Sequence, residues 1–191
     1  MASWGKVVRG AALGAGVVAL VAGCNSDGGG TDGTTKASAT STVAADVPAG
    51  FDACKDIPQS VLQSEQLKNK GVDSKDGNGG VKWRGCIWVQ SGGDGYGGTI
   101  DTTNITLPMV RANKEFTVAE ELSVSGRPAL TYALSGQDLR AHCILSVEMK
   151  GGSLEVSIDN PSSAKQTAGQ HSCDIAKRLA GQIVPAIPAS L

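Results

Sequence analysis

The sequence predicts an α+β domain: an antiparallel sheet of about five or six strands, with an N-terminal and a C-terminal helix packed on one face and two disulfides. Consecutive β-rich segments are separated by short Gly-containing turns, and such turns join antiparallel rather than parallel strands. The clearest helical periodicities lie near the two ends of the globular part. The length of 191 residues fits one such domain with an N-terminal appendage.

The composition excludes several classes of protein. The chain has 17 Lys and Arg against 18 Asp and Glu, a formal net charge of −1, so it lacks the basic excess of a nucleic-acid-binding protein. Hydrophobic residues make up 40% and aromatic residues only 4%, so Val, Ile, Leu and Ala must build the core. These values also exclude a multi-span membrane protein, a disordered chain and a coiled coil.

The first 24 residues predict the compartment. Lys6 and Arg9 precede an uncharged, apolar stretch over 10–22, which has the length of a secretory signal and is too short to span a bilayer stably. The stretch ends in Val21-Ala22-Gly23-Cys24, which matches the lipobox of bacterial lipoproteins. We therefore expect residues 1–23 to be a cleaved lipoprotein signal peptide and Cys24 to carry lipid. An ordinary signal peptide and a retained transmembrane anchor are the alternatives.

The expected acyl chains would hold the mature protein at the outer face of the cell membrane, because two or more chains anchor a protein stably where one does not. Cleavage removes two of the 17 basic residues and none of the 18 acidic ones, which leaves a net charge of −3. No polybasic patch is therefore expected to strengthen the anchor.

Residues 24–49 predict the lipidated cysteine and a flexible tether. Gly, Ser, Thr, Ala and Asp dominate this stretch, and Val43 and Val47 are its largest apolar side chains. Such a composition buries too little surface to offset the entropy lost on ordering. An O-glycosylated stalk is the alternative. A single globular domain is expected over residues 50–191.

The first half of the domain predicts one helix and a hairpin. Asp56 suits the N-cap position, and Ile57, Val61 and Leu62 share one face at helical spacing. Gly71 would end this helix. The remaining elements expected here are a polar loop over 73–80, a strand over 81–90, a Gly loop over 92–98 and a strand over 99–107.

The second half predicts a short helix, four strands and a closing helix. In the closing helix, Ile175, Leu179 and Ile183 repeat every four residues, Ser172 suits the N-cap, and Pro185 ends the pattern. An earlier start near Asn160 is the alternative. The other expected elements are a short helix over 108–116 and strands over 120–124, 129–134, 140–149 and 154–158.

Four cysteines follow Cys24, and an even number in an exported chain predicts two disulfides. Pairing Cys54 with Cys86 and Cys143 with Cys173 is preferred, because each bridge then ties a helix start to a nearby strand. The main rival pairs Cys54 with Cys173 and Cys86 with Cys143. Zinc binding is disfavoured, since neither CxxC nor HxxxH spacing occurs.

Two histidines stand beside two of these cysteines. A Cys143–Cys173 bridge would bring His142 and His171 close together. Either they form a paired imidazole site or they are ordinary surface histidines. No metal and no cofactor are expected.

Catalytic motifs are present only as isolated fragments. Residues 93–98 fit GxGxxG, but a strand rather than a phosphate-binding helix follows them. Ser162-Ser163-Ala164-Lys165 fits SxxK without its SDN and KTG partners. Residues 73–79 resemble half of a calcium loop that lacks its terminal Glu. We therefore assign no catalytic residue and expect no enzymatic activity.

Basic residues gather around the first predicted strand, which also carries Trp83 and Trp88. The two indoles are five residues apart, so they face opposite sides of a regular strand. Either the cluster is a solvated loop with packed tryptophans, or it binds an acidic polymer, a lipid headgroup or a protein partner. The basic members are Lys68, Lys70, Lys75, Lys82 and Arg84. The candidate binding residues are Trp83, Arg84, Trp88, His142 and His171.

Landmarks spread along the domain resemble a known family. They are residues 51–58 with Cys54, then Cys86-Ile87-Trp88, residues 124–129, Cys143 on a strand and Cys173 at the start of the last helix. With the lipobox, they resemble uncharacterised actinobacterial lipoproteins catalogued as a domain of unknown function. The resemblance spans roughly residues 50 to 188. It implies an exported, lipid-anchored, disulfide-bonded domain, with no established activity and no functional residues to transfer.

These observations predict an exported, lipid-anchored protein of the cell envelope that serves as a binding or accessory domain. Its partners would be the membrane, through the lipid anchor, and an envelope protein, lipid or polymer, but not a nucleic acid. A carrier or sensor of a small apolar ligand or lipid is the first alternative. An envelope hydrolase that uses one histidine is the second.

Overall fold

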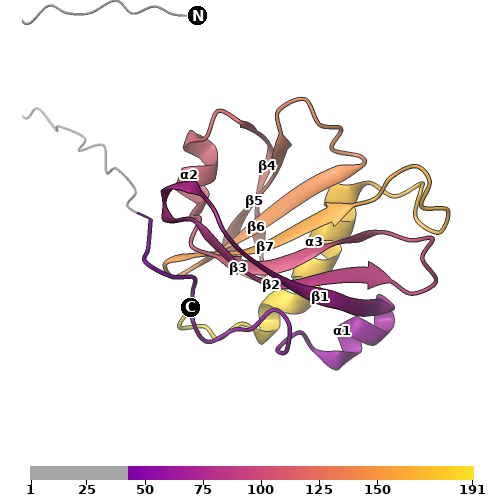
Figure 1. Cartoon of the computed structure of the whole chain (residues 1–191), viewed down its shortest axis with the longest axis horizontal. Helices are drawn as coiled ribbons and strands as arrows, with labels where there is room; N and C mark the ends of the chain where they lie inside the picture. The colour runs from indigo at the N-terminus through magenta and orange to yellow at the C-terminus, as the bar shows by residue number, and fades with distance from the viewer. Residues whose placement is uncertain (1–42) are drawn as a thin grey trace, which may run out of the picture. The chain divides into compact units, whose positions relative to one another are not determined.

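A computed structural model describes residues 43–191; the expected signal peptide, Cys24 and most of the expected tether lie outside the described residues. Seven strands form one antiparallel sheet in the order β1-β2-β3-β7-β6-β5-β4 (Figure 1). Within the described part, no helix is long and apolar enough to cross a membrane. The strands are β1 (Leu67–Asp76), β2 (Lys82–Gln90), β3 (Gly97–Thr103), β4 (Phe116–Val124), β5 (Arg127–Leu134), β6 (His142–Met149) and β7 (Gly152–Asp159). The helices are α1 (Gln59–Ser64), α2 (Leu107–Ala112) and α3 (Ser172–Ile183), with short 3-10 turns η1 (Asn78–Gly80) and η2 (Val184–Ala186).

One face of the sheet packs against α3 and α1. Ile175, Leu179 and Ile183 lie on one side of α3 and are at most 1% exposed, and α3 packs mainly on β6 and β7. Val61 of α1 joins the same core. The second face carries a smaller apolar cluster around α2, which includes Leu107. The expected α+β class with an antiparallel sheet is confirmed, although the sheet has seven strands rather than five or six.

The additional strand is β1, which occupies residues expected to end a helix and form a polar loop. Helix α1 stops at Ser64, and Gln66 then adopts a left-handed conformation with φ of 55°, which reverses the chain. Of the ten residues of β1, only Leu67 is buried. An edge strand needs few apolar side chains, because one of its edges and much of its surface face water. The sequence of β1 therefore lacks the alternation of apolar and polar residues that usually predicts a strand.

The helix ends also differ from expectation. Asp56 does not cap α1; its Oδ2 accepts a hydrogen bond of 2.7 Å from the backbone N–H of Asp52, and the helix follows Pro58. At α3 the cap is His171 rather than Ser172. The Nδ1 of His171 accepts from the backbone N–H of Cys173 at 3.3 Å.

Two disulfides form with the preferred pairing, Cys54–Cys86 and Cys143–Cys173. The first ties the segment before α1 to β2, and the second ties β6 to the start of α3. The bridged residues are 32 and 30 positions apart. A closed loop of this size stabilises a domain by roughly 2–4 kcal/mol.

A partly buried ionic network joins the end of α1, the β2–β3 loop and α3. The carboxylate of Glu65 accepts hydrogen bonds from Nε and Nη2 of Arg178 at 2.9 and 3.1 Å. It also accepts from the hydroxyl of Tyr96 and the amide of Gln182, each at 2.9 Å. Burial opposes ionisation of Glu65, but these hydrogen bonds outweigh it and lower the pKa of the carboxyl group.

We expect Glu65→Gln to lower the free energy of unfolding by roughly 1–3 kcal/mol, because Arg178 and Tyr96 lose their charged acceptor. Chemical unfolding followed by circular dichroism measures the change. The control is Glu115→Gln at an exposed loop position, which should change stability by less than about 0.5 kcal/mol. Equal effects of the two substitutions would contradict the structural role of the network.

Candidate functional site

The sheet face opposite α3 carries a row of polar residues across neighbouring strands. Asp73, Gly85, Asp101, Glu155 and Ser146 are successive cross-strand partners on β1, β2, β3, β7 and β6. On β3, β7 and β6 the adjacent residues Ile100, Val156 and Leu145 belong to the core beneath α3. Directly opposed residues on one face lie roughly 5 Å apart at Cβ, so the pairing brings acidic groups from distant segments together.

Asp101 is the most unusual member of this row. Its residue is 0% exposed, and neither carboxylate oxygen has a hydrogen-bond partner among the described residues. The carboxylate lies over Gly85: a Cβ added to Gly85 would clash with the backbone carbonyl oxygen of Ile100 and with Oδ1 of Asp101. The close approach therefore requires a glycine at this position of β2.

Glu155 lies beside Asp101 and is 7% exposed. Its Oε2 accepts a hydrogen bond of 3.1 Å from the hydroxyl of Tyr132, which also lies 3.3 Å from the hydroxyl of Ser146. Unlike Asp101, Glu155 thus has a donor. Together the two carboxyl groups form a buried acid pair, the name used for them below.

The environment of the acid pair favours its protonated form. Burial is the main reason that the pKa of Asp101 is raised to about 8. The nearby hydroxyl of Thr99 opposes the rise, and the negative charges of Asp73 and Glu155 reinforce it. Burial likewise raises the pKa of Glu155. The ammonium of Lys75 binds Asp73 at 2.9 Å and lies 5.4 Å from the Trp83 ring centre. Its charge opposes the rise at both carboxyl groups without cancelling it.

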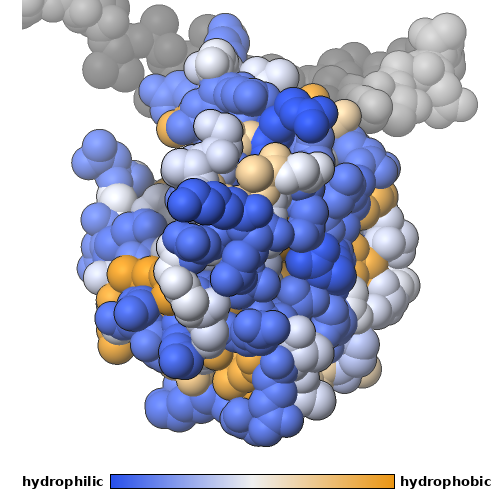
Figure 2. Space-filling view, turned by 90° about the vertical axis from the view of Figure 1, so that its right-hand side faces the viewer, coloured by the Kyte–Doolittle hydropathy of each residue, from blue (hydrophilic) through white to orange (hydrophobic). Residues whose placement is uncertain are grey.

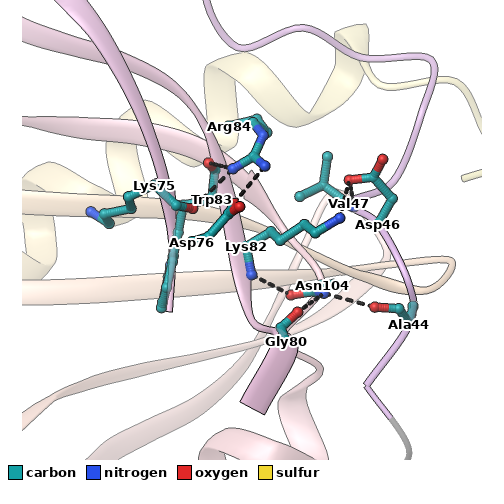
Figure 3. Close-up of polar contacts among 10 residues, drawn as sticks. All are labelled: Ala44, Asp46, Val47, Lys75, Asp76, Gly80, Lys82, Trp83, Arg84 and Asn104. Carbon is teal, nitrogen blue, oxygen red and sulfur yellow. Dashed lines mark hydrogen bonds and ion pairs between the residues drawn. The ribbon is translucent and has the colours of Figure 1, made fainter. Parts of the chain in front are cut away.

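Arg84, a candidate binding residue, is occupied by partners within the domain (Figure 3). Its Nη2 lies 2.5 Å from Oδ1 of Asp76. Its Nη1 donates to the carbonyl groups of Lys75 and Trp83 at 2.9 and 2.7 Å. The guanidinium therefore braces β2 against β1, and its charge is neutralised locally.

Asn104 organises the adjoining corner of the domain (Figure 3). It is 0% exposed, and its Oδ1 accepts from the backbone N–H of Lys82 at 2.8 Å. Its Nδ2 donates to the carbonyl groups of Ala44 and Gly80 at 2.8 and 2.9 Å. Asp46 also lies 3.6 Å from the ammonium of Lys82. The last residues of the expected tether thus join the domain beside the start of β2.

The two tryptophans face opposite sides of β2, as predicted. Trp88 is 5% exposed within the core beneath α3, and its Nε1 has no hydrogen-bond partner among the described residues. Trp83 is partly buried on the other face, against the cluster around α2. Trp88 is therefore a core residue, and Trp83 is the indole that borders the row of acids.

The two histidines have separate structural partners. Nδ1 of His142 lies 2.5 Å from Oδ1 of Asp159, its cross-strand neighbour on β7, whereas His171 caps α3. The hydrogen bond to Asp159 raises the pKa of His142. Among residues 43–191, no cluster of three or more His, Cys, Asp or Glu side chains could hold a metal ion.

Comparison with known proteins assigns the chain to a family. The family described as "Protein of unknown function (DUF3558)" matches residues 19–186. The chain belongs to the DUF3558 family. The expected resemblance to a family of unknown function is thereby confirmed, and the match begins earlier than the expected residue 50. Neither the curated proteins nor the solved structures contain a match to this chain.

The acid pair of this DUF3558 protein was not among the residues expected from its sequence. Each carboxyl group has a local signal, however: Asp101 interrupts the β-branched run of β3, and Glu155 lies between Leu154 and Val156. An acidic residue at the centre of a strand is unfavourable unless its surroundings accommodate it. What the sequence does not show is that the two residues are opposed.

We expect Asp101→Asn to flatten the pH dependence of stability of the DUF3558 protein. Because the pKa of Asp101 rises from an ordinary 3.8 to about 8 on folding, the folded state binds the proton more tightly and stability falls as pH rises across this interval. Asn cannot ionise, so the variant should be more stable than the wild type above about pH 8. Melting temperatures measured between about pH 4 and pH 9 test this prediction. Asp94→Asn at an exposed position is the control. Parallel plots of melting temperature against pH for the wild type and both variants would contradict the prediction.

The His142–Asp159 contact should contribute stability only at low pH. The raised pKa of His142 means that the contribution is complete below the ordinary value of 6.5 and is lost as pH rises through the folded value. His142→Gln should therefore cost more stability at about pH 5.5 than at about pH 8.5, by less than about 1 kcal/mol, since the pair is partly exposed. Asp159→Asn should show the same trend, and a pH-independent loss in either variant would count against it.

Proposed function

We propose that this DUF3558 protein is an exported, lipid-anchored domain of the cell envelope that binds an envelope component. The observation that carries the proposal is the pairing of the cysteines. The four cysteines of the domain form two bridges, which use every cysteine of the chain except Cys24. Disulfides form and persist in oxidising compartments outside the cytoplasm.

The remaining cysteine is the one that the lipobox marks for lipid. Cys24 follows Val21-Ala22-Gly23 directly, behind the apolar stretch of the signal peptide. The family match begins at residue 19 and therefore includes this cysteine. Acyl chains on Cys24 would keep the domain at the outer membrane face, with the tether as its link.

A binding role is supported by the way in which the second sheet face is built. Helix α2 packs on only part of this face. Beyond it, Thr99 and Ser157 are partly exposed and Asp159 is exposed on β3 and β7. The histidines provide less support for a hydrolase. Within the described residues, no serine, threonine or cysteine shares a hydrogen bond with the His142–Asp159 pair, so the nucleophile of a triad has no place there.

Metabolic labelling in a bacterial host tests the anchor. We expect the wild-type chain to incorporate an alkyne-tagged fatty acid and to enter the detergent phase, whereas Cys24→Ser should do neither, because the acylated thiol is lost. The Cys54→Ser/Cys86→Ser double variant is the control and should keep its label. Labelling that survives Cys24→Ser, or a cytoplasmic protein with reduced thiols, would overturn the proposal.

A further inference from the structure

The sheet ends in two edge strands, β1 and β4, which lie at the bottom and the top of the sheet in Figure 1. An edge strand presents backbone N–H and C=O groups that no neighbouring strand pairs, so another chain can add to it. Natural proteins protect such edges with lysines, prolines, bulges or short strands. Both edges are long here, with ten residues in β1 and nine in β4, but they are protected to different degrees.

β1 carries several protective features. Three of its ten residues are lysines, and side chains of the domain bond two of its backbone groups. The N–H of Gly71 donates to Oδ1 of Asn69 at 2.7 Å, and the carbonyl oxygen of Lys75 accepts from Nη1 of Arg84 at 2.9 Å. An added strand would have to displace these bonds and accommodate the lysines.

β4 lacks both the lysines and the side-chain bonds. Its sequence FTVAEELSV contains no Lys, Arg or Pro and is rich in residues that favour strands. No side chain of the described residues hydrogen-bonds to its backbone; the contacts of Glu120 and Glu121 go to the side chains of Lys177 and Arg111. Each edge strand has one register shift, and residues 120–124 of β4 follow theirs in regular pairing. β4 is therefore the more open of the two edges.

A cavity of about 270 Å³ adjoins this open edge, between β4 and the start of α3. Its charged part consists of Glu120 of β4 and of Asp174 and Lys177 of α3. The ammonium of Lys177 lies 3.0 Å from Oε2 of Glu120 and 3.3 Å from Oδ1 of Asp174. Two carboxylates thus share one ammonium. The side chains of Glu120 and Asp174 are 50% and 69% exposed, so both can be reached from solvent.

The other walls of the cavity add polarity but no positive charge. Lys177 is the one lysine or arginine among the residues that line it. His171 accepts a hydrogen bond from the backbone N–H of Cys173 through Nδ1, so that nitrogen carries no proton while the bond is made. Thr131 also lines the cavity; it is 1% exposed, and its hydroxyl has no partner among the described residues. The surplus of acid therefore suits a basic side chain.

The position of Glu120 connects the cavity to the edge. Glu120 pairs with Thr131 of β5, on the sheet face that packs against α3. A residue of an added strand directly opposite Glu120 would have its Cβ roughly 5 Å away on the same face. Because alternate side chains of a strand share a face, every second residue of the added strand would lie on the α3 side.

Apolar side chains give no comparable docking surface. Figure 2 views the domain from the right-hand side of Figure 1 and shows a mostly hydrophilic surface with small hydrophobic areas. The large exposed hydrophobic side chains of the described residues, Val72, Ile87 and Leu134, lie on three different strands. Strand addition needs no such patch, since main-chain hydrogen bonds supply affinity and side-chain pockets supply specificity.

We propose that β4 binds an extended segment of a partner protein, which adds a strand to the sheet and places a Lys or Arg side chain beside Glu120 and Asp174. The inference rests on the proposed binding role and names the class of partner. A peptide is required, because only a polypeptide backbone matches the alternating donors and acceptors of a strand edge. A second copy of β4 is a poor occupant, since the acidic Glu120 and Glu121 of the two strands repel each other.

Selection from a displayed library of random peptides tests the proposal, with the full mature chain in detergent as the target. The peptides have about nine residues, the length of β4. We expect enriched sequences to combine a Lys or Arg with β-branched or aromatic residues at alternate positions. One enriched peptide is then synthesised with and without N-methyl groups on alternate residues. Methylation removes the donors along one edge and should abolish binding.

Matched variants of neighbouring residues locate the basic side chain. Glu120→Gln should weaken binding of the enriched peptide by about fivefold, as expected for loss of a partly exposed charge pair. The control is Glu121→Gln, which removes the same charge from the next residue of β4, on the opposite face of the sheet, and should change affinity by less than about twofold. Melting temperatures of both variants check that the fold is retained.

Hydrogen–deuterium exchange of the complex locates the backbone contact. Amides within residues 117–124 should exchange more slowly when the peptide is bound, because the unpaired groups of β4 gain partners. Amides within residues 72–76 of β1 should be unchanged and serve as the internal control.

The proposal is overturned by the absence of enriched peptides, by equal binding of the methylated peptide, by equal effects of the two Glu variants, or by protection of β1 instead of β4. Self-association of the chain that the enriched peptide displaces would also overturn it, because the occupant would then be a second copy. The labelling experiment at Cys24 is independent. Intact labelling without peptide binding refutes only the edge site, and peptide binding without labelling refutes only the anchor.

Discussion

Burial of one sheet face beneath α3 is the constraint on which the rest of the structure depends. The chain has few aromatic residues, so this core is built from aliphatic side chains that alternate along β6 and β7 and meet Ile175, Leu179 and Ile183 of α3. Two disulfides tie the segment before α1 and the start of α3 to this sheet. The alternation that buries one face also commits every second residue to the other face. That second face is where the unusual polar groups lie.

Two buried carboxylates show how differently a charge can be accommodated. Glu65 receives donors from Arg178, Tyr96 and Gln182, so it remains ionised and ties three elements together. Asp101 is at least as buried, and neither the hydroxyl of Thr99 nor the charge of Lys75 outweighs its burial, so the pKa of its carboxyl group is raised. A buried carboxylate that receives several hydrogen bonds stabilises the structure. A buried carboxyl group without such donors lowers stability when it ionises, and it can gain or lose its proton as pH changes.

The positive charges of the domain follow a similar division. Most of those near β1 and β2 are used within the molecule, where Arg84 and Lys82 brace the corner at which the tether joins. Lys68 and Lys70 stay free of such partners in the described chain and border a cavity at the other end of β2. β2 thus runs from the corner where Ala44 and Asp46 contact the domain to an end bordered by exposed lysines.

The sequence by itself determined the features that depend on neighbouring residues. The antiparallel hairpins, the closing helix and the opposite faces of Trp83 and Trp88 follow from spacing and turn chemistry. Spacing favoured the observed cysteine pairing but left its rival open, and the tertiary structure decided between them. Only the tertiary structure decided the place of β1, whose polar residues form a strand because β2 supplies the hydrogen bonds. It also placed Asp101 opposite Glu155 on the neighbouring strand, and it determined which lysines form ion pairs. These outcomes depend on strand order and register, which join segments that are far apart in the chain and leave no local periodicity.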